Sequence, residues 1–217
     1  TCQSGACACK TDMPVGWPAA VAPWSKNPVV VPSKGHAMEG SDNIYAPEIH
    51  PLSKGWVMWY GGQGKSGHDR IFVATSADGV QWNKWPSGAA PKAVLDPGSS
   101  NHVNDPSVVK VGGTYYMYYT DAATGIMDTI WLATGKSLTK FTKVTKVLGP
   151  GSAGSWESLK VGRPAVLYEG GLFTLWYDGQ DGKSRHVGYP PSTDAQPFTR
   201  PTANPVLTTA GAVHVNR

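Results

Sequence analysis

The fold is decided by one stretch of the sequence, Asn104-Asp105-Pro106-Ser107-Val108-Val109-Lys110-Val111-Gly112-Gly113-Thr114-Tyr115-Tyr116-Met117-Tyr118-Tyr119. Two runs of apolar and aromatic residues flank a Gly-Gly pair, and this pattern predicts two antiparallel strands joined by a tight turn. The second run is apolar or aromatic on both of its faces. A strand of this kind needs cover on both sides, so its sheet is expected to be a middle layer.

The same pattern occurs three times along the chain. Each copy opens near a proline, and these prolines lie 59 and 58 residues apart: Pro47, Pro106 and Pro164. The same two intervals separate the tyrosines that end the second runs: Tyr60, Tyr119 and Tyr177. A repeat of this length indicates stacked supersecondary units, and radially arranged four-stranded blades are a standard form of them.

We therefore predict an all-β fold, a β-propeller built of four-stranded blades. The expected boundaries are about 44–95 for blade 1, 103–148 for blade 2 and 161–207 for blade 3. A short apolar run at 27–31 has no hairpin partner before it, and it matches the last strand of the other repeats. We expect this run to be an outer strand that completes another blade.

The first part of the chain differs from the rest. Residues 1–23 are expected to be irregular, with several prolines as breakers, so the propeller should occupy 24–217. Three cysteines lie in this segment, and their proximity predicts that Cys2 forms a disulfide with Cys7 or Cys9. Such a bond is typical of an oxidising compartment, so we expect a secreted, extracellular protein.

Composition argues against two classes of partner. The chain has 217 residues, of which 16% are charged, and 19 Lys and Arg against 15 Asp and Glu give a net charge of +4. There is no basic run, so we expect no nucleic-acid partner. No apolar stretch is long enough to cross a bilayer, so we expect no membrane partner.

Three blades are fewer than the four to eight that usually close a propeller. The last four residues, His-Val-Asn-Arg at 214–217, echo His-Val-Asn-Asp at 102–105, so the chain stops where a fourth first strand is expected. We therefore expect a second chain fragment or a second copy of the chain to complete the ring.

The repeated motifs resemble a known group of enzymes. Asn-Asp-Pro-Ser-Val-Val at 104–109, followed by Gly-Gly-Thr-Tyr-Tyr-Met-Tyr-Tyr-Thr at 112–120, resembles the five-bladed propellers of glycoside hydrolase families 43, 32, 62, 68 and 130. The segments 74–82 and 154–158 resemble them too, and the likeness covers about 27–217. Sialidase propellers are the rival. Their repeated box also joins Ser, Asp, Gly and Trp, but here it occurs once and is one residue too short between Asp78 and Trp82.

The resemblance implies hydrolysis of O-glycosyl bonds in plant or microbial polysaccharides, as by arabinanases and xylosidases. In families 43 and 32, three carboxylates surround a central funnel, at or just before the proline of each inner strand. The aligned positions here are Ala46, Asp105 and Arg163, so only Asp105 matches. Whether the chain is an enzyme stays open. A non-catalytic carbohydrate-binding propeller or a degenerate hydrolase is the alternative, and an interaction scaffold is the second.

Other carboxylates are candidates for the two missing ones. Asp42 and Glu157 precede the first strands of blades 1 and 3, where loops are expected to open onto the binding face. Glu48 shares a strand face with Ala46, because residues two apart point the same way. The candidate catalytic residues are therefore Asp105, Glu157, Asp42 and Glu48.

The candidate substrate-binding residues are polar or aromatic, and they are Arg163, Trp156, His102 and Asn104. Arg163 is expected to bind a carboxylate or sugar hydroxyls, or to pair with Asp105. Trp156 lies on a loop, where its ring can stack on a sugar. We predict no metal site and no cofactor, and a structural calcium ion is the alternative left open.

Overall fold

A computed structural model describes most of the chain, namely residues 25–34, 36, 39, 43–96, 101–123 and 127–208. These residues contain twelve β-strands and no helix, so none of them belongs to a helix that could span a membrane. The predicted disulfide, the irregular segment 1–23 and the candidate Asp42 lie outside the described residues.

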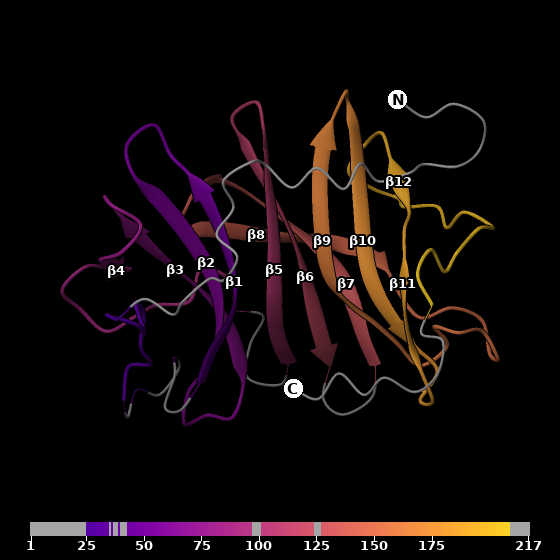
Figure 1. Ribbon diagram of the computed structural model, residues 1–217, viewed down its shortest axis with the longest axis horizontal. Helices are drawn as coiled ribbons and strands as arrows, with labels where there is room; N and C mark the ends of the chain where they lie inside the picture. The colour runs from indigo at the N-terminus through magenta and orange to yellow at the C-terminus, as the bar shows by residue number, and fades with distance from the viewer. Residues whose placement is uncertain are drawn as a thin grey trace.

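Three antiparallel four-stranded sheets make up the structure (Figure 1). The first sheet has the order β1 (Asn43–Pro51), β2 (Trp56–Gln63), β3 (Asp69–Ser76) and β4 (Trp82–Lys84). The second has the order β5 (Asn101–Val111), β6 (Thr114–Ala123), β7 (Met127–Ser137) and β8 (Lys140–Leu148). In the third, β10 (Leu172–Gln180) pairs with β9 (Lys160–Glu169) on one side and with β11 (Arg185–Gly188) and β12 (Pro191–Ser192) on the other.

The sheets are arranged as propeller blades. The first strands β1, β5 and β9 stand side by side, and β5 contacts both of the others. In Figure 1, β3 and β4 lie to the left of this row, and β11 and β12 lie to its right. Isolated bridges from Ile71 to Leu95 and from Val187 to Leu207 extend the outer edges of the first and third sheets. The predicted all-β propeller of four-stranded blades is therefore confirmed.

The second sheet is covered on both faces, as its sequence predicts. Met117 and Tyr119 of β6 pack in one cluster with Trp59 of the first sheet. Tyr118, between them, packs in the other cluster with Leu175 of the third sheet. All of these side chains are buried. Fully burying a large apolar side chain contributes roughly 1.5–3 kcal/mol, so the two faces of β6 hold the three sheets together.

The run 27–31 forms no strand, in contrast to the prediction. Pro28 and Pro32 lack the N–H groups that a strand would donate to a neighbour. Val30 instead packs against Met58 and Tyr60 on the face of the first sheet. On the third sheet, Leu167 of β9 is 52% exposed. That a second chain covers such surfaces stays a prediction.

Candidate functional site

The first strand of each sheet carries a bulge at its proline. The pairing register shifts between Tyr45 and Glu48 in β1 and between Asn104 and Ser107 in β5, and the β9–β10 pair shifts at the matching place. The residues just before the prolines have φ values of 49°, 49° and 51°, and they are Ala46, Asp105 and Arg163. Residues with a Cβ rarely adopt such angles. The three positions are therefore structural equivalents, as the alignment in the sequence predicts, and bulges of this kind re-aim side chains.

Asp105 is held by the neighbouring strand of its own sheet. Thr120 of β6 donates a hydrogen bond from Oγ1 to Asp105 Oδ2 at 3.1 Å. The same hydroxyl oxygen accepts the backbone N–H of Arg163 at 2.9 Å. Thr120 thus orients the carboxylate and also ties the second sheet to the third at the level of the site.

Arg163 forms an ion pair within the third sheet. Its Nη1 lies 2.8 Å from Asp178 Oδ2, which also accepts a hydrogen bond from Arg185 Nη1 at 2.7 Å. Burial lowers the pKa of Arg163, but the carboxylates of Asp178 and Asp105 together raise it by more than burial lowers it. The pKa of Arg163 therefore lies above its usual value. Arg163 therefore remains a cation beside Asp105.

A second carboxylate comes from the first sheet. Asp69 Oδ2 on β3 lies 3.0 Å from His102 Nδ1 and 3.4 Å from Asn104 Nδ2, both on β5. Burial raises the pKa of Tyr45, and the charge of Asp69, its hydrogen bond and the charge of Asp105 add to the rise. Tyr45 therefore stays protonated, and the charges of both carboxylates act on its hydroxyl.

Asn104 has a buried acceptor oxygen. Its Oδ1 is buried and has no hydrogen-bond partner within the described part of the chain. Buried polar atoms are nearly always satisfied, and an unsatisfied one calls for an explanation such as a bound ligand or water. A sugar hydroxyl is a donor of the size and chemistry that this oxygen would accept.

Glu48 is engaged between the first and second sheets. Its Oε1 lies 2.9 Å from His50 Nε2 and accepts the backbone N–H of Val108 at 3.2 Å. The equivalent residue of the next sheet, Ser107, accepts the N–H of Val166 at 3.1 Å. This position therefore joins successive first strands, and Glu48 has the contacts of a structural residue.

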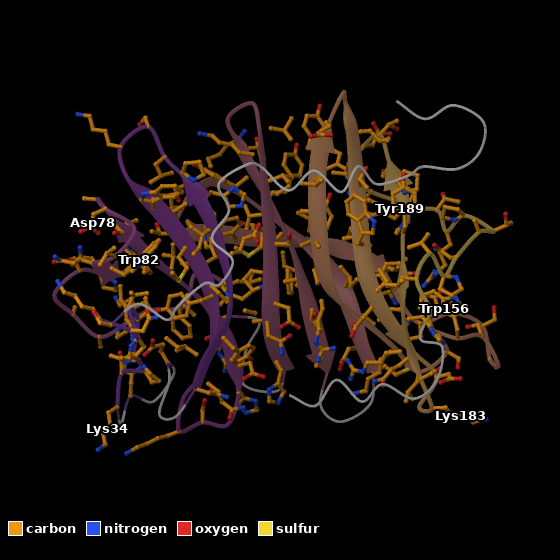
Figure 2. All side chains as sticks on the ribbon, in the orientation of Figure 1. Lys34, Asp78, Trp82, Trp156, Lys183 and Tyr189 are labelled. Atoms are coloured by element: carbon orange, nitrogen blue, oxygen red, sulfur yellow. The ribbon has the colours of Figure 1, made fainter. Side chains whose placement is uncertain are left out.

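Glu157 is buried beside the third sheet. The hydroxyl of Tyr177 donates to Glu157 Oε2 at 2.7 Å, and Arg200 Nε lies 2.7 Å from Oε1. The side chain of Glu157 is only 4% exposed. Trp156 is half-buried and stacks on Tyr177, with ring centroids 5.9 Å apart. Figure 2 shows Trp156 at the third-sheet side of the molecule, away from the row of first strands.

The first sheet repeats this arrangement. Glu39 is fully buried, with Lys84 Nζ 2.6 Å from Oε1 and the hydroxyl of Tyr60 3.3 Å from the same atom. Tyr60 and Tyr177 hold the same place in their repeats. The recurrence of tyrosine, glutamate and cation in two blades indicates that Glu157 stabilises its blade.

The structure thus brings four of the predicted residues to one end of the sheets: Asp105, Arg163, His102 and Asn104. It places Glu48, Glu157 and Trp156 elsewhere. Sequence reasoning missed four members of the site: Tyr45, Asp69, Thr120 and Asp178. The sequence did contain one signal for Asp69, namely its recurrence in the repeat. Asp69 lies two residues before an isoleucine of its third strand, and Asp128 holds the same place in the next repeat. Among the described residues, no group of three or more His, Cys, Asp and Glu is placed to hold a metal ion.

Comparison with known proteins supports the fold. No protein-family model matches the chain, and no curated protein sequence matches it. Solved structures do match. Zg3597, a family 117 glycoside hydrolase of the marine bacterium Zobellia galactanivorans, superposes with a TM-score of 0.67 over 82% of this chain and 60% of its own, at 18% identity. The chain therefore shares the propeller fold of this glycoside hydrolase.

Two further structures agree. A thermostable family-43 glycoside hydrolase matches with a TM-score of 0.60 over 80% of this chain and 58% of its own, at 20% identity. An α-L-arabinofuranosidase from Lactobacillus brevis matches with a TM-score of 0.61 over 77% and 57%, at 17% identity. This chain therefore spans about 60% of the length of these three glycoside hydrolases.

Proposed function

We propose that this propeller acts on carbohydrate and hydrolyses an O-glycosyl bond at the site around Asp105. One observation carries the proposal. Asp105 occupies the bulge position that repeats in all three blades, with Thr120 fixing its carboxylate at 3.1 Å and the cation of Arg163 beside it. A carboxylate held in one geometry is what positional catalysis requires.

Glycoside hydrolysis uses two carboxyl groups, one to protonate the leaving oxygen and one to activate water or attack the sugar. The first aligned position holds Ala46, so the second carboxyl group has to come from another residue. Asp69 is a carboxylate of the first sheet, and its charge and that of Asp105 both raise the pKa of Tyr45. We therefore assign the pair to Asp105 and Asp69.

The polar groups around this pair fit a sugar. Asn104 Oδ1 is a buried acceptor without a partner among the described residues, and Arg163 supplies N–H donors. We propose a plant or microbial polysaccharide of the arabinan or xylan type as substrate, and a secreted protein, as the sequence predicts. The likeness to an α-L-arabinofuranosidase supports this choice.

A non-catalytic, carbohydrate-binding propeller is the second candidate. Two of the three equivalent bulge positions carry no carboxylate, since they hold Ala46 and Arg163. Arg163 is also engaged by Asp178, so it acts as a binding group and not as an acid. This candidate keeps the same site and removes only the hydrolytic step.

The two candidates separate in one set of assays. The protein is incubated with aryl arabinosides, aryl xylosides and the corresponding polysaccharides, and binding of the same ligands is measured by calorimetry. Asp105→Asn should lower turnover at least about a hundredfold, the usual scale for loss of an acid or base. Asp194→Asn, an exposed carboxylate just after β12, is the matched control.

Each outcome is decisive. Turnover that survives Asp105→Asn in full rules out the assignment of Asp105. Binding without turnover by the unaltered protein favours the non-catalytic candidate. Neither binding nor turnover on any of these glycans contradicts both.

A further inference from the structure

A separate cavity lies between the first and second sheets, at the other end of the strands. Its volume is about 400 Å³, within the range of small-molecule sites. The lining residues come from the β1–β2 hairpin and from both strands of the β5–β6 hairpin, and they include His50, Lys54, Val57, Lys110 and Tyr115. Figure 1 shows these two hairpins together at the upper edge of the sheets.

The cavity is distinct from the site around Asp105. Asp105 and Lys110 lie on the same strand, five residues apart, which corresponds to about 16 Å at roughly 3.3 Å per residue. The Asp105 site also uses His102 and Asn104 in the first half of β5, whereas the cavity uses Val108 and Lys110 in its second half. A ligand in the cavity would therefore leave the Asp105 site open.

The next interface along the repeat shows that the cavity is a local departure. Between the second and third sheets the equivalent space is filled by three aromatic rings. Tyr116 and Phe173 lie 5.3 Å apart, and Tyr168 and Phe173 lie 4.6 Å apart, between ring centroids. At the equivalent places, the first interface has a valine, a lysine and a tyrosine: Val57 for Tyr116, Lys110 for Tyr168 and Tyr115 for Phe173. Two rings are therefore missing, and the space they would fill is hollow.

The lining combines an apolar floor with a cationic rim. Val57 and Val108 are buried at the floor, and Tyr115 adds a half-buried ring. Lys54 and Lys110 are exposed at the rim, and the Lys110 ammonium lies 5.0 Å from the centroid of the Tyr115 ring. An apolar surface beside two ammonium groups matches a ring that has an apolar face and carries a negative charge.

We propose that this cavity binds an acidic sugar unit, a single ring that carries a carboxylate or a sulfate. The floor and Tyr115 pack against the ring, and Lys54 and Lys110 bind the anion. That the ring belongs to a sugar rests on the proposed function, whereas the preference for a negative charge rests on the lysines alone. The site would hold a polysaccharide to the protein without taking part in hydrolysis.

Binding is tested with three disaccharides of similar size, one uronate, one sulfated and one neutral. Each is titrated into the purified protein, with calorimetry or tryptophan fluorescence as the readout. The unaltered protein should bind at least one acidic disaccharide, and the neutral one at least tenfold more weakly. The two acidic arms distinguish carboxylate from sulfate.

Variants locate the site. Lys110→Gln should weaken acidic-disaccharide binding at least about tenfold, the scale of a lost charge-assisted hydrogen bond. Lys110→Tyr, which introduces the ring of the next interface, should abolish it. Lys146→Gln removes an exposed lysine of β8 outside the cavity and should change nothing. Asp105→Asn should bind the acidic disaccharide as the unaltered protein does.

Different outcomes would contradict the cavity proposal and the hydrolytic proposal separately. Equal binding of neutral and acidic disaccharides, no binding at millimolar concentration, or undiminished binding by Lys110→Gln would overturn the inference. Loss of binding in Asp105→Asn alone would place the ligand at the other site. If the protein binds the acidic disaccharide but hydrolyses none of the glycans, the proposal for the cavity is supported and the hydrolytic proposal is refuted.

Discussion

Replacing Glu157 tests whether its carboxylate stabilises the blade or takes part in catalysis. In Glu157→Gln the ion pair with Arg200 Nε at 2.7 Å is lost, whereas the new side-chain carbonyl can still accept the hydroxyl of Tyr177. Breaking a buried ion pair costs about 3–5 kcal/mol, because the remaining charge is left without its partner. Arg200 keeps 32% of its side chain exposed, so water compensates part of this cost. We expect a loss of about 3 kcal/mol.

The expected loss is large enough to measure by thermal unfolding. For a chain of this size, each kcal/mol shifts Tm by roughly 2–4 °C, so Glu157→Gln should lower Tm by roughly 6–12 °C. Glu39→Gln is the matched variant in the first sheet, where Lys84 lies 2.6 Å away, and it should behave alike. Glu169→Gln, at an exposed strand end, should leave Tm within a degree or two.

Activity measured on the same variants completes the test. If Glu157 has a structural role, turnover of folded Glu157→Gln at a temperature well below its Tm should stay within a few-fold of the unaltered protein. An unchanged Tm together with a hundredfold loss of turnover would refute the structural reading. It would return Glu157 to the catalytic residues, as the sequence proposes.

Three further predictions can be tested. Ala46→Gly relieves a left-handed φ of 49° and should stabilise the protein by up to about 1 kcal/mol in urea unfolding; a clear loss of stability would show that the Ala46 methyl is needed. Thiol titration of the unfolded protein should find one free cysteine, and three would exclude a bond from Cys2 to Cys7 or Cys9. Burial raises the pKa of five tyrosines, which are Tyr45, Tyr60, Tyr118, Tyr119 and Tyr177. Below about pH 10 these five tyrosines are protonated in both the folded and the unfolded state. Above about pH 10 only the unfolded state loses their protons. The free energy of unfolding should therefore fall by up to about 1.4 kcal/mol per tyrosine and pH unit. The tyrosinate absorbance of these five residues should therefore appear together with the loss of the near-ultraviolet dichroism of the folded state. Ionisation of all five within an intact fold would contradict this.

Local patterns account for the parts of the fold that could be predicted. The β5–β6 hairpin follows from apolar runs on either side of Gly112-Gly113, and both faces of β6 are covered because its sequence has no polar face. The run 27–31 was predicted as a strand, but it pairs with no strand of the described residues. Its apolar residues satisfy the pattern, but Pro28 and Pro32 limit its hydrogen bonding, and Val30 is partly buried by packing instead.

The site was predicted less completely, because it depends on contacts between distant residues. The position before each proline identified Asp105 and Arg163. Asp69 enters from a third strand of the neighbouring blade, through a contact with His102 that joins residues 33 apart in the sequence. The surroundings of Glu157 could not be predicted for the same reason, since nothing next to it in the sequence indicates that Tyr177 and Arg200 enclose it.

The bulge before each proline separates backbone geometry from side-chain chemistry. A methyl group, a carboxylate and a guanidinium occupy it, at Ala46, Asp105 and Arg163, with φ values that differ by no more than 2°. The bulge imposes this geometry whichever side chain is present, so the side chain is interchangeable. The groups around the propeller axis can therefore be exchanged blade by blade, in evolution or in the laboratory, without a change of strand register. A carboxylate introduced by Ala46→Asp would point along a direction that the backbone already provides.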